Sequence, residues 1–417
     1  MTERSLRGAR TALALLLGIN LFNYIDRQIL AAVEPDIRST FFSSGDANAM
    51  FKTGILLGSA FLVTYMIAAP VLGFLADRIS RWVIVGSAVI VWSLASGGSG
   101  LAASFEALVA TRIFVGIGEG GYGPAAPTIL ADLFPIQTRG RVMAVFCAAI
   151  PVGSALGYVI GGVIGAHLGW RWAFYSVAPP GLLLGLLCFW QRDPRVAPHH
   201  LVQKSPRRGL TDYLKLFQTR SYLINCIAQT LMTFAIGGLG FWVPAYLRFR
   251  NQSPAAGLSI FGGITVVAGL ISTLLGGIIA DKARARFPGS YFLVSGIGML
   301  VAAPIFVASL YIPFPAAWIA MFIAIFFIFM NTGPSNTALA NVSLPAVRAT
   351  AFAVNIFVIH ALGDVQAYWL LGYIGGHTNM RVAFLFMSGI MLAAGVTWLI
   401  GVKHLPGDTA AVENAMA

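Results

Sequence analysis

The chain has 417 residues, of which 58% are hydrophobic and 10% are charged, and its formal net charge is +12. Soluble domains are about 45–50% apolar and about 25% charged. This composition therefore excludes a soluble enzyme, a disordered chain and a disulfide-stapled secreted module, and it predicts a polytopic membrane protein.

Apolar runs of the length that crosses a bilayer, about 20 residues each, recur along the whole chain. The first follows a short basic segment, MTERSLRGAR, without a clear cleavage site, so we expect it to be a retained span. We expect twelve spans, at 11–33, 52–75, 83–103, 107–131, 141–166, 171–190, 221–247, 255–280, 290–311, 315–342, 348–373 and 381–402.

Most of the 27 Lys and Arg residues fall in one set of alternating loops and tails. This bias marks the cytoplasmic side of a membrane protein. We therefore expect a multi-pass protein of the cell inner (plasma) membrane with both termini in the cytoplasm. The net positive charge reflects this orientation, and we do not expect a nucleic-acid partner.

The longest polar stretch, 191–220, divides the expected spans into six and six. We predict an N-terminal six-helix bundle at 1–190, a cytoplasmic linker at 191–220 and a C-terminal six-helix bundle at 221–417. A short amphipathic helix near 209–220 and a plain loop are both compatible with the linker sequence.

The two halves repeat a loop motif: GFLADRISR at 73–81 corresponds to GIIADKARAR at 277–286. We expect each glycine to let helices approach closely. We also expect each aspartate to pair with basic residues of a neighbouring helix as a latch that breaks during alternating access. The predicted cytoplasmic gate comprises Asp77, Arg78, Arg81, Arg139, Arg141, Asp281, Lys282 and Arg348.

This paired loop resembles the signature of the major facilitator superfamily. The resemblance implies an all-α membrane protein with twelve transmembrane helices in two pseudo-symmetric six-helix bundles. Duplicated halves also indicate a transporter whose substrate site lies between them.

Charged residues stand inside two apolar spans of the first half. In the first span, Asn23, Tyr24 and Arg27 share one helical face, and Asp26 points off its edge toward a neighbouring helix of the same half. In the fourth span, Arg112 and Glu119 share a face and precede the run Gly-Gly-Tyr-Gly-Pro at 120–124, which we expect to be flexible. A charge at the bilayer centre costs from about 2.5 to above 10 kcal/mol unless it is paired or hydrated.

These residues suggest proton coupling and headgroup binding. Asp26 and Glu119 are the carboxylates able to bind and release a proton. Arg27 and Arg112 keep their charge, so we expect them to pair with the carboxylates or with an anionic headgroup, together with Asn23, Tyr24 and Tyr122. The alternative is a static ion-pair network that only fixes helix packing.

The second half carries fewer such groups. Its one mid-span carboxylate, Asp364, lies one turn after His360, which suits either a proton relay or a simple hydrogen bond. Buried amides of this half, such as Asn355, are expected to bridge helices. We therefore expect one charged wall and one apolar wall, an arrangement that suits a substrate with a polar head and an apolar body.

Three runs of the first half resemble the Spinster family of lipid transporters: NLFNYIDR at 20–27, VGIGEGGYGPAAPTILADLFP at 115–135 and AIPVGSALGYVIGG at 149–162. The resemblance implies movement of a lysophospholipid or a sphingosine-phosphate-like lipid, coupled to protons. It also implies that Arg27 and Glu119 form a key pair, with Asp26 and Arg112 as neighbours.

Two other transporter classes remain open. Organic-anion (carboxylate) symporters share the Asn-Tyr-x-Asp-Arg pattern, but they carry a Lys after the span-four proline, and no Lys stands between 120 and 135 here. A multidrug/proton antiporter is the second alternative. A channel or membrane-embedded enzyme is disfavoured, because no nucleophile motif, phosphate-binding loop, metal cluster or filter-like repeat occurs. We expect a monomer in the bilayer that binds a lipid or other small amphipathic substrate and protons, without cofactor, metal or enzymatic activity.

Overall fold

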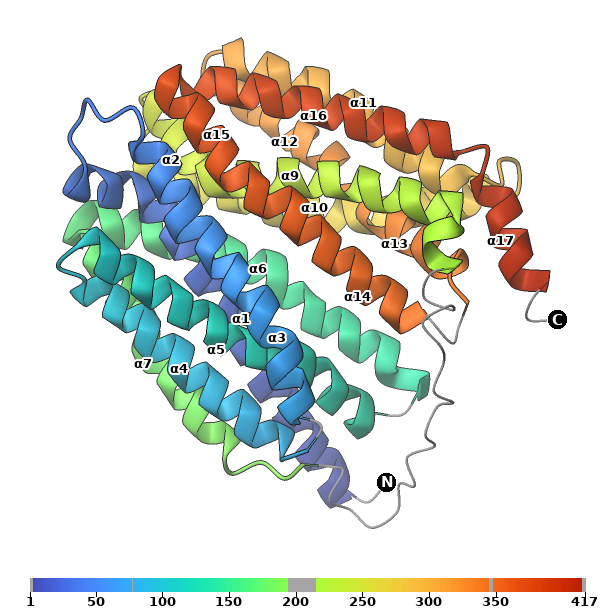
Figure 1. The fold of residues 1–417 in the computed structure, drawn as a ribbon, viewed down its shortest axis with the longest axis horizontal. Helices are drawn as coiled ribbons and strands as arrows, with labels where there is room; N and C mark the ends of the chain where they lie inside the picture. Colours follow the sequence, from blue (N-terminus) through green and yellow to red (C-terminus); the bar gives the residue numbers. More distant parts are fainter. Residues whose placement is uncertain (1–2, 77, 135, 194–214, 345–347, 415–417) are drawn as a thin grey trace. The chain divides into compact units, whose positions relative to one another are not determined.

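A computed structural model describes residues 3–414 apart from 77, 135, 194–214 and 345–347. Some side chains within described helices, including those of Arg139, Arg141 and Arg348, also lie outside the description. The described residues form helices and connections, without a strand (Figure 1).

The helices of the first half of the chain begin close to the N-terminus. They are α1 (Glu3–Phe41), α2 (Ala49–Thr53), the π-helical segment η1 (Gly54–Ser59), α3 (Ala60–Ala76), α4 (Arg81–Leu101), α5 (Phe105–Leu133), α6 (Ile136–Leu168) and α7 (Trp170–Cys188).

The helices of the second half follow the linker. They are η3 (Lys215–Gln218, a 3₁₀ turn), α9 (Arg220–Phe249), α10 (Pro254–Arg284), α11 (Ser290–Tyr311), α12 (Ala316–Phe329), α13 (Thr332–Asn341), α14 (Arg348–Ile359), the π-helical segment η4 (His360–Asp364), α15 (Val365–His377), α16 (Met380–Gly401) and α17 (Leu405–Asn414).

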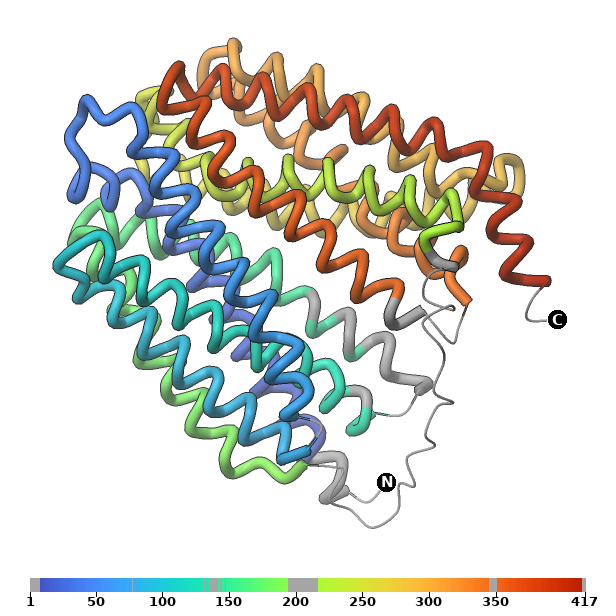
Figure 2. The backbone as a smooth tube through the Cα atoms, viewed as in Figure 1, coloured from blue at the N-terminus to red at the C-terminus, as the bar shows by residue number. Residues whose placement is uncertain are grey.

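The chain divides into two compact units, which Figure 2 allows the reader to follow along the backbone. Unit 1 comprises Met1–Val202 and Val243–Gly262, and unit 2 comprises Gln203–Trp242 and Gly263–Ala417. The last part of α9, from Val243 onward, and the first part of α10, as far as Gly262, thus belong to unit 1. Each unit is described by itself below.

Among the described residues, ten helices are long and apolar enough to cross a membrane. The expected spans 107–131 and 171–190 correspond to α5 and α7, which are not among the ten. Helix α5 contains Arg112 and Glu119, and such charges lower the hydropathy of a helix. A count of twelve therefore stays a prediction.

The first expected span ends too early. Helix α1 continues past residue 33 to Phe41 with Pro35 inside it, so Glu34 belongs to the helix rather than to a loop. A proline in a helix interior removes one backbone hydrogen bond, but the packing of the surrounding unit outweighs that loss.

Short polar residues fix several helix starts. The Ser104 side chain accepts a hydrogen bond from the Ala107 N–H at 3.2 Å and caps α5. The Asn379 side chain accepts from the N–H groups of Arg381 and Val382 and caps α16. Each cap satisfies N–H groups that have no partner within the helix.

Glycines of α6 bring its backbone against α1. A Cβ atom at Gly153 would lie 2.6 Å from the Leu21 carbonyl oxygen, and one at Gly157 would lie 2.6 Å from that of Ile25. No side chain fits at these distances, so glycine is required here. The contact fixes the stretch of α1 that carries Asp26 and the residues around it.

Helix α5 is packed in the same way on two sides. A Cβ at Gly116 would meet the backbone of α3, and one at Gly118 would meet the backbone of α4. The run at 120–124 is helical throughout, contrary to the flexible segment expected from its glycines. The glycines act in packing, and they hold Glu119 in a fixed position between two neighbouring helices.

Candidate functional site

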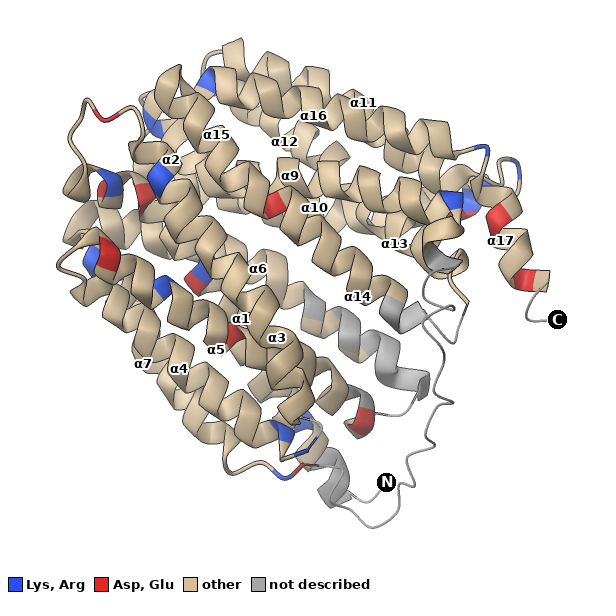
Figure 3. Cartoon of the chain, viewed as in Figure 1, with Lys and Arg blue, Asp and Glu red and all other residues tan. Residues whose placement is uncertain are grey.

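The centre of unit 1 holds an ion pair between α1 and α5. The Nη2 and Nε atoms of Arg27 lie 2.5 and 2.7 Å from the Oε2 atom of Glu119. The Glu119 side chain is fully buried, whereas the Arg27 side chain is 23% exposed. The pair is therefore exposed only through its arginine side chain. Figure 3 shows charged residues mostly toward the helix ends and only a few within the helices.

A second pair lies deeper in the same unit. Asp26 accepts a hydrogen bond from the Ser96 hydroxyl of α4, and its Oδ2 atom lies 4.0 Å from Nη1 of Arg112. Asp26 thus faces neighbouring helices of its own unit, the direction expected from the sequence. Both Asp26 and Arg112 are buried, and Oδ2 of Asp26 and Nε and Nη1 of Arg112 have no hydrogen-bond partner among the described residues.

Three aromatic rings surround the Arg27 guanidinium. Its Cζ atom lies 5.2 Å from the ring centre of Tyr24, 5.1 Å from that of Phe61 and 5.4 Å from that of Tyr65. Arg112 lies 5.7 Å from the Phe61 ring. The negative face of an aromatic ring attracts a cation, more strongly when water is excluded. The rings therefore hold Arg27 in place when its carboxylate partner is neutral.

Asn23 and Tyr122 take different positions around this pair. Asn23 is buried close to the Glu119 carboxylate, and its Nδ2 atom has no hydrogen-bond partner among the described residues. Tyr122 is also buried, and its hydroxyl donates to the Leu16 carbonyl oxygen at 3.1 Å. The Tyr122 hydroxyl therefore ties α5 to α1, and a role in headgroup binding stays a prediction.

The geometry suits a role in proton coupling. A proton on Glu119 would remove the charge that holds Arg27, and a negatively charged group would then bind Arg27 more easily. A buried ion pair with one partner neutralised leaves the other charge uncompensated, at a cost of about 3–5 kcal/mol. An anionic ligand removes that cost. The same groups can also act as a fixed structural pair that holds α1 against α5.

One of the predicted gate residues makes a dense network at the other end of α4. The Arg81 side chain is 4% exposed, and its Nη2 atom lies 2.7 Å from Oδ2 of Asp132 and 2.9 Å from Oδ1 of Asp193. The Arg81 N–H also donates to Asp193 at 2.8 Å, and Nη1 donates to the Thr128 hydroxyl. Arg81 therefore joins the start of α4, the end of α5 and the segment after α7.

The other gate residues are less engaged in the described structure. Arg78 is exposed, donates to the Phe74 carbonyl oxygen of the preceding helix α3 at 3.2 Å and stacks on the Phe74 ring. Asp281 accepts a hydrogen bond from the Tyr291 hydroxyl at 2.8 Å, and Lys282 is exposed. Residue Asp77 and the side chains of Arg139, Arg141 and Arg348 lie outside the described residues, so the latch stays a prediction.

The loop glycines do not bring helices together as expected. A Cβ at Gly73 would make an ordinary contact of 3.5 Å with Pro124, and one at Gly277 would meet nothing within 4 Å. In unit 1 the close approaches come from glycines inside α5 and α6, and in α10 from Gly276, whose Cβ would meet the backbone of Met330. A repeated motif shows that a residue recurs, but only the packed structure shows which neighbour it meets.

In unit 2, His360 and Asp364 form a pair in the π-helical segment η4. Nδ1 of His360 lies 2.6 Å from Oδ2 of Asp364. A Cβ at Gly237 of α9 would lie within 2.8 Å of the Asp364 carboxyl carbon, so glycine leaves room for this carboxyl group. The pair is present, and the structure is compatible with both roles that the sequence left open.

Unit 2 also contains a neutral network of buried amides and hydroxyls. Gln229 of α9 donates to the Ser335 hydroxyl at 2.9 Å and accepts from Asn355 Nδ2 at 2.7 Å. Asn225 of α9 donates to the Ser335 carbonyl oxygen and accepts from Trp398 Nε1. Asn355 thus bridges α14 to α9 as predicted, and the network joins four helices without a charge.

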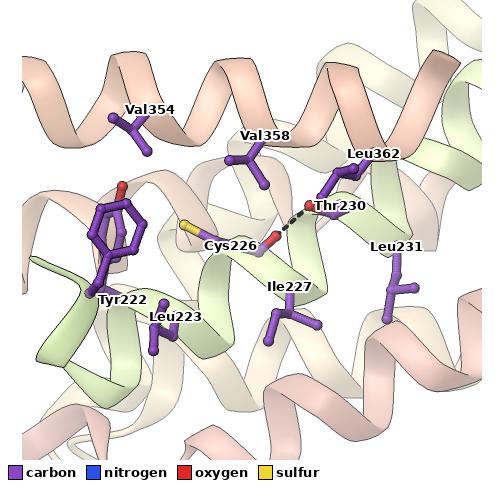
Figure 4. Close-up of a pocket in the computed structure, with 10 residues that line it drawn as sticks. Tyr222, Leu223, Cys226, Ile227, Thr230, Leu231, Val354, Val358 and Leu362 are labelled. Atoms are coloured by element: carbon purple, nitrogen blue, oxygen red, sulfur yellow. Dashed lines mark hydrogen bonds between the residues drawn. The ribbon is translucent and has the colours of Figure 1, made fainter. Parts of the chain in front are cut away.

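An apolar pocket of about 280 Å³ lies beside this network in unit 2 (Figure 4). It is lined by α9 residues between Tyr222 and Leu231, by Val354 and Val358 of α14 and by two flanking residues. The Thr230 hydroxyl in its wall donates to the Cys226 carbonyl oxygen at 2.7 Å, the bond drawn in Figure 4. The lining contains no charged residue and suits hydrocarbon.

The sequence did not single out several residues that the structure brings to these sites. Ser96, Phe61 and Tyr65 surround the central charges, and Asp132 and Asp193 bind Arg81. None carries a spacing signal relative to its partner, because each partner belongs to another helix. No group of three or more His, Cys, Asp or Glu residues within the described part of the chain is arranged to hold a metal ion.

Comparison with known proteins places the chain in a family. The family model of the Major Facilitator Superfamily matches residues 16–365. The chain is 35% identical to Protein spinster homolog 3 of Danio rerio over 89% of this chain and 78% of the relative. It is 34% identical to the sphingosine-1-phosphate transporter SPNS2 of Xenopus tropicalis over 85% of this chain and 71% of the relative.

Solved structures agree on the fold. The structure of a bacterial homologue of the human lysosomal transporter Spinster, in an inward-facing and unoccupied conformation, superposes with a TM-score of 0.82 at 22% identity over 99% of both chains. A D-xylose–proton symporter superposes with a TM-score of 0.72 at 19% identity over 93% of this chain and 96% of that one. The fold is thus the major facilitator fold of multi-pass membrane transporters.

Together with the family model, the extent and identity of the spinster matches confirm the resemblance seen in the sequence and the expectation of a transporter rather than an enzyme. The chain belongs to the spinster family of the major facilitator superfamily.

Proposed function

We propose that this protein is a secondary active transporter of an amphipathic lipid, a lysophospholipid or sphingosine-phosphate-like molecule, driven by protons through alternating access. The observation that carries the proposal is the buried Arg27–Glu119 pair, in which one oxygen of Glu119 has no hydrogen-bond partner among the described residues. The relatives named as sphingosine-1-phosphate transporters support the lipid class.

The proposed cycle uses the pair as an exchange site. Glu119 binds a proton and releases Arg27, and the anionic headgroup of the lipid then binds Arg27. Arg112 lies 4.0 Å from its nearest carboxylate oxygen, so it is a second candidate for the headgroup. Asp26, with one oxygen free, is the second candidate for the proton.

The apolar part of the substrate requires a surface whose polar groups do not need hydrogen bonds from the ligand. Unit 2 provides apolar side chains and a network whose amides are largely satisfied by one another. Burial of hydrocarbon contributes about 0.8 kcal/mol per methylene group. A charged unit and a largely neutral unit therefore match the two ends of an amphipathic molecule.

The gate is proposed to lie at the end of the bundles that the basic bias assigns to the cytoplasm. Asp77 is the proposed latch residue, and its replacement by asparagine is expected to shift the balance between inward- and outward-open states. Cysteine accessibility at the two mouths measures that balance. Unchanged accessibility would mean that the charges of the repeated loop only set the orientation of the protein in the membrane.

The test of the function is flux into proteoliposomes of the purified protein, with and without a pH gradient. The panel sets lysophospholipids and sphingoid phosphates against short carboxylates and sugar acids. Lipid flux that is stimulated by the gradient and requires Arg27 and Glu119 supports the proposal. Carboxylate flux with the lipids inert would identify an organic-anion symporter, and broad extrusion of unrelated cations would identify a multidrug antiporter.

A further inference from the structure

A buried carboxylate of unit 1 takes no part in the mechanism above. Glu34 of α1 has a side chain that is 1% exposed. Its Oε1 atom accepts hydrogen bonds from the Thr53 hydroxyl at 2.7 Å and from Arg38 Nε at 3.1 Å. Its Oε2 atom is buried and has no hydrogen-bond partner among the described residues.

Glu34 lies on the same face of α1 as the central pair. It follows Arg27 by seven residues, which is about two helical turns or about 10 Å along the axis. Residues seven apart point in nearly the same direction. Asn23, Arg27 and Glu34 therefore lie along one face of α1, with the apolar residue Ala31 between Arg27 and Glu34.

One backbone hydrogen bond of the regular helical pattern is missing in the stretch between Arg27 and Glu34. Pro35 has no N–H group, so the carbonyl group of Ala31 loses its usual donor four residues later. Ala31 lies between the two charged residues on the same face. Its carbonyl oxygen is an acceptor at the place where the polar face would otherwise be interrupted.

The neighbouring chain is irregular over the same interval. Thr53, which binds Glu34, immediately precedes the π-helical segment η1, and Phe61, which contacts Arg27, follows that segment by two residues. The π-helical segment thus lies between the residue that binds Glu34 and the residue that contacts Arg27. π-Helical segments are often found at functional sites.

The other ionisable groups near this end of unit 1 are engaged elsewhere or exposed. Lys52 lies 2.9 Å from Asp46, and Arg248 lies 2.5 Å from Asp36. The remaining ones on the elements that pack on α1 are Arg171, which donates to the Ala102 carbonyl oxygen, and the exposed residues Glu106 and His167. Arg38 is therefore the cation that faces Glu34.

From these observations we infer that Glu34 is a second proton-binding site on the transport path. A proton from water at the Phe41 end of α1 binds Oε2 of Glu34. Water hydrogen-bonded along the face that contains the Ala31 carbonyl then accepts this proton and delivers a proton to the carboxylate of Glu119, which leaves Glu34 ionised again. The inference rests on the proposed proton coupling and adds a route to it.

The experiment compares Glu34→Gln with the matched variant Glu106→Gln, an exposed carboxylate in the same unit. Glutamine keeps the oxygen that accepts from Thr53 and Arg38, so the fold is retained. Lipid flux driven by a pH gradient is expected to fall about 10-fold in Glu34→Gln and to be unchanged in Glu106→Gln. Exchange of lipid without a gradient is expected to persist in both variants.

A second variant tests the titration itself. Thr53→Val removes a donor that stabilises the charged form of Glu34, and hydrogen bonds to charged groups contribute about 1.5–3 kcal/mol. The midpoint of the pH profile for flux is therefore expected to move. A purely structural contact would lower flux at every pH without moving the midpoint.

The outcomes separate the two proposals. Gradient-driven flux that depends on Glu119 but is unchanged in Glu34→Gln overturns the role of Glu34 and leaves the proposed function intact. If the wild-type protein moves no lipid, the proposed function fails. Infrared titration then tests Glu34 without a substrate, since its carboxyl band is expected to appear on acidification in the wild-type protein and to vanish in Glu34→Gln. An identical band in both proteins overturns the inference.

Discussion

The two units differ in how they handle polar groups inside a membrane protein. Unit 1 has charged side chains at its centre, Asp26, Arg27, Arg112 and Glu119, and several of their atoms lack a hydrogen-bond partner among the described residues. Unit 2 buries amides and hydroxyls that bind one another. Unmatched buried charge is costly. The unmatched atoms of these four charged residues lie in unit 1, whereas unit 2 has the His360–Asp364 pair and a largely neutral framework.

The largest expected effect removes the central charge of unit 1. In Glu119→Gln we expect gradient-driven lipid flux to fall about 100-fold and its pH dependence to be lost, because Arg27 keeps its charge without a partner at a cost of about 3 kcal/mol. Initial rates in proteoliposomes measure this. Arg27→Lys keeps the charge but loses the planar contact and is expected to be intermediate. A Glu119→Gln protein with normal pH dependence would remove Glu119 from proton coupling.

The next effect concerns the stability of unit 1. Arg81→Gln leaves Asp193, whose side chain is 2% exposed, without its cation, and we expect a loss of about 3 kcal/mol in the free energy of unfolding. Asp132→Asn is the matched control, because Asp132 is 45% exposed and its pair with Arg81 contributes less than about 1 kcal/mol. Thermal unfolding in detergent compares the two. Equal losses would mean that burial does not distinguish these two pairs.

A smaller effect is expected in the neutral network of unit 2. Gln229→Leu removes the partner of Asn355 and of the Ser335 hydroxyl, so unfolding is expected to become easier by about 1–3 kcal/mol. The pH profile of flux is expected to stay unchanged, in contrast to Glu119→Gln. A shifted profile in this variant would show that unit 2 also takes part in proton coupling and would weaken the contrast between the units.

The smallest effect lies in a loop outside the spans. Hydrogen bonds from the Lys52 side chain and the Asn48 N–H hold the pKa of Asp46 below its ordinary value. The stabilisation by the charged form is therefore complete above the ordinary value and is lost as the pH falls through the lowered one. We expect Asp46→Asn to unfold slightly more easily than the wild type at neutral pH and equally at strongly acidic pH. Melting temperatures over a pH series measure the difference, and a gap that widened on acidification would contradict it.

The structure describes more of the predicted central site than of the predicted gate. Arg27, Asp26, Arg112 and Glu119 stand out because a charge within an apolar run is rare and expensive, and helical spacing alone puts Arg112 and Glu119 on one face. The gate depended on a repeated motif, and the partners of Arg81 come from α5 and from the end of α7. Such partners are distant in sequence and carry no periodic signal.

The ends of helices were also difficult to predict from the sequence. The first expected span stops at residue 33 because the apolar run ends before Glu34, yet α1 continues for two further turns. A charged residue ends an apolar run in the sequence, but it does not end a helix whose next turns pack against neighbours. The same reasoning explains why the glycine-rich run at 120–124 is helical.

By itself, the sequence determined the membrane class, the family and the identity of the central charged residues, because composition, apolar run length and local motifs carry that information along the chain. Only the tertiary structure decided that Glu119 faces Arg27, that Asp26 faces Ser96 and that Glu34 is buried with a free oxygen. The physical reason is that pairing and burial depend on which helices pack together. In unit 1, that packing is set by backbone contacts at Gly116, Gly118, Gly153 and Gly157, whose partners lie on other helices.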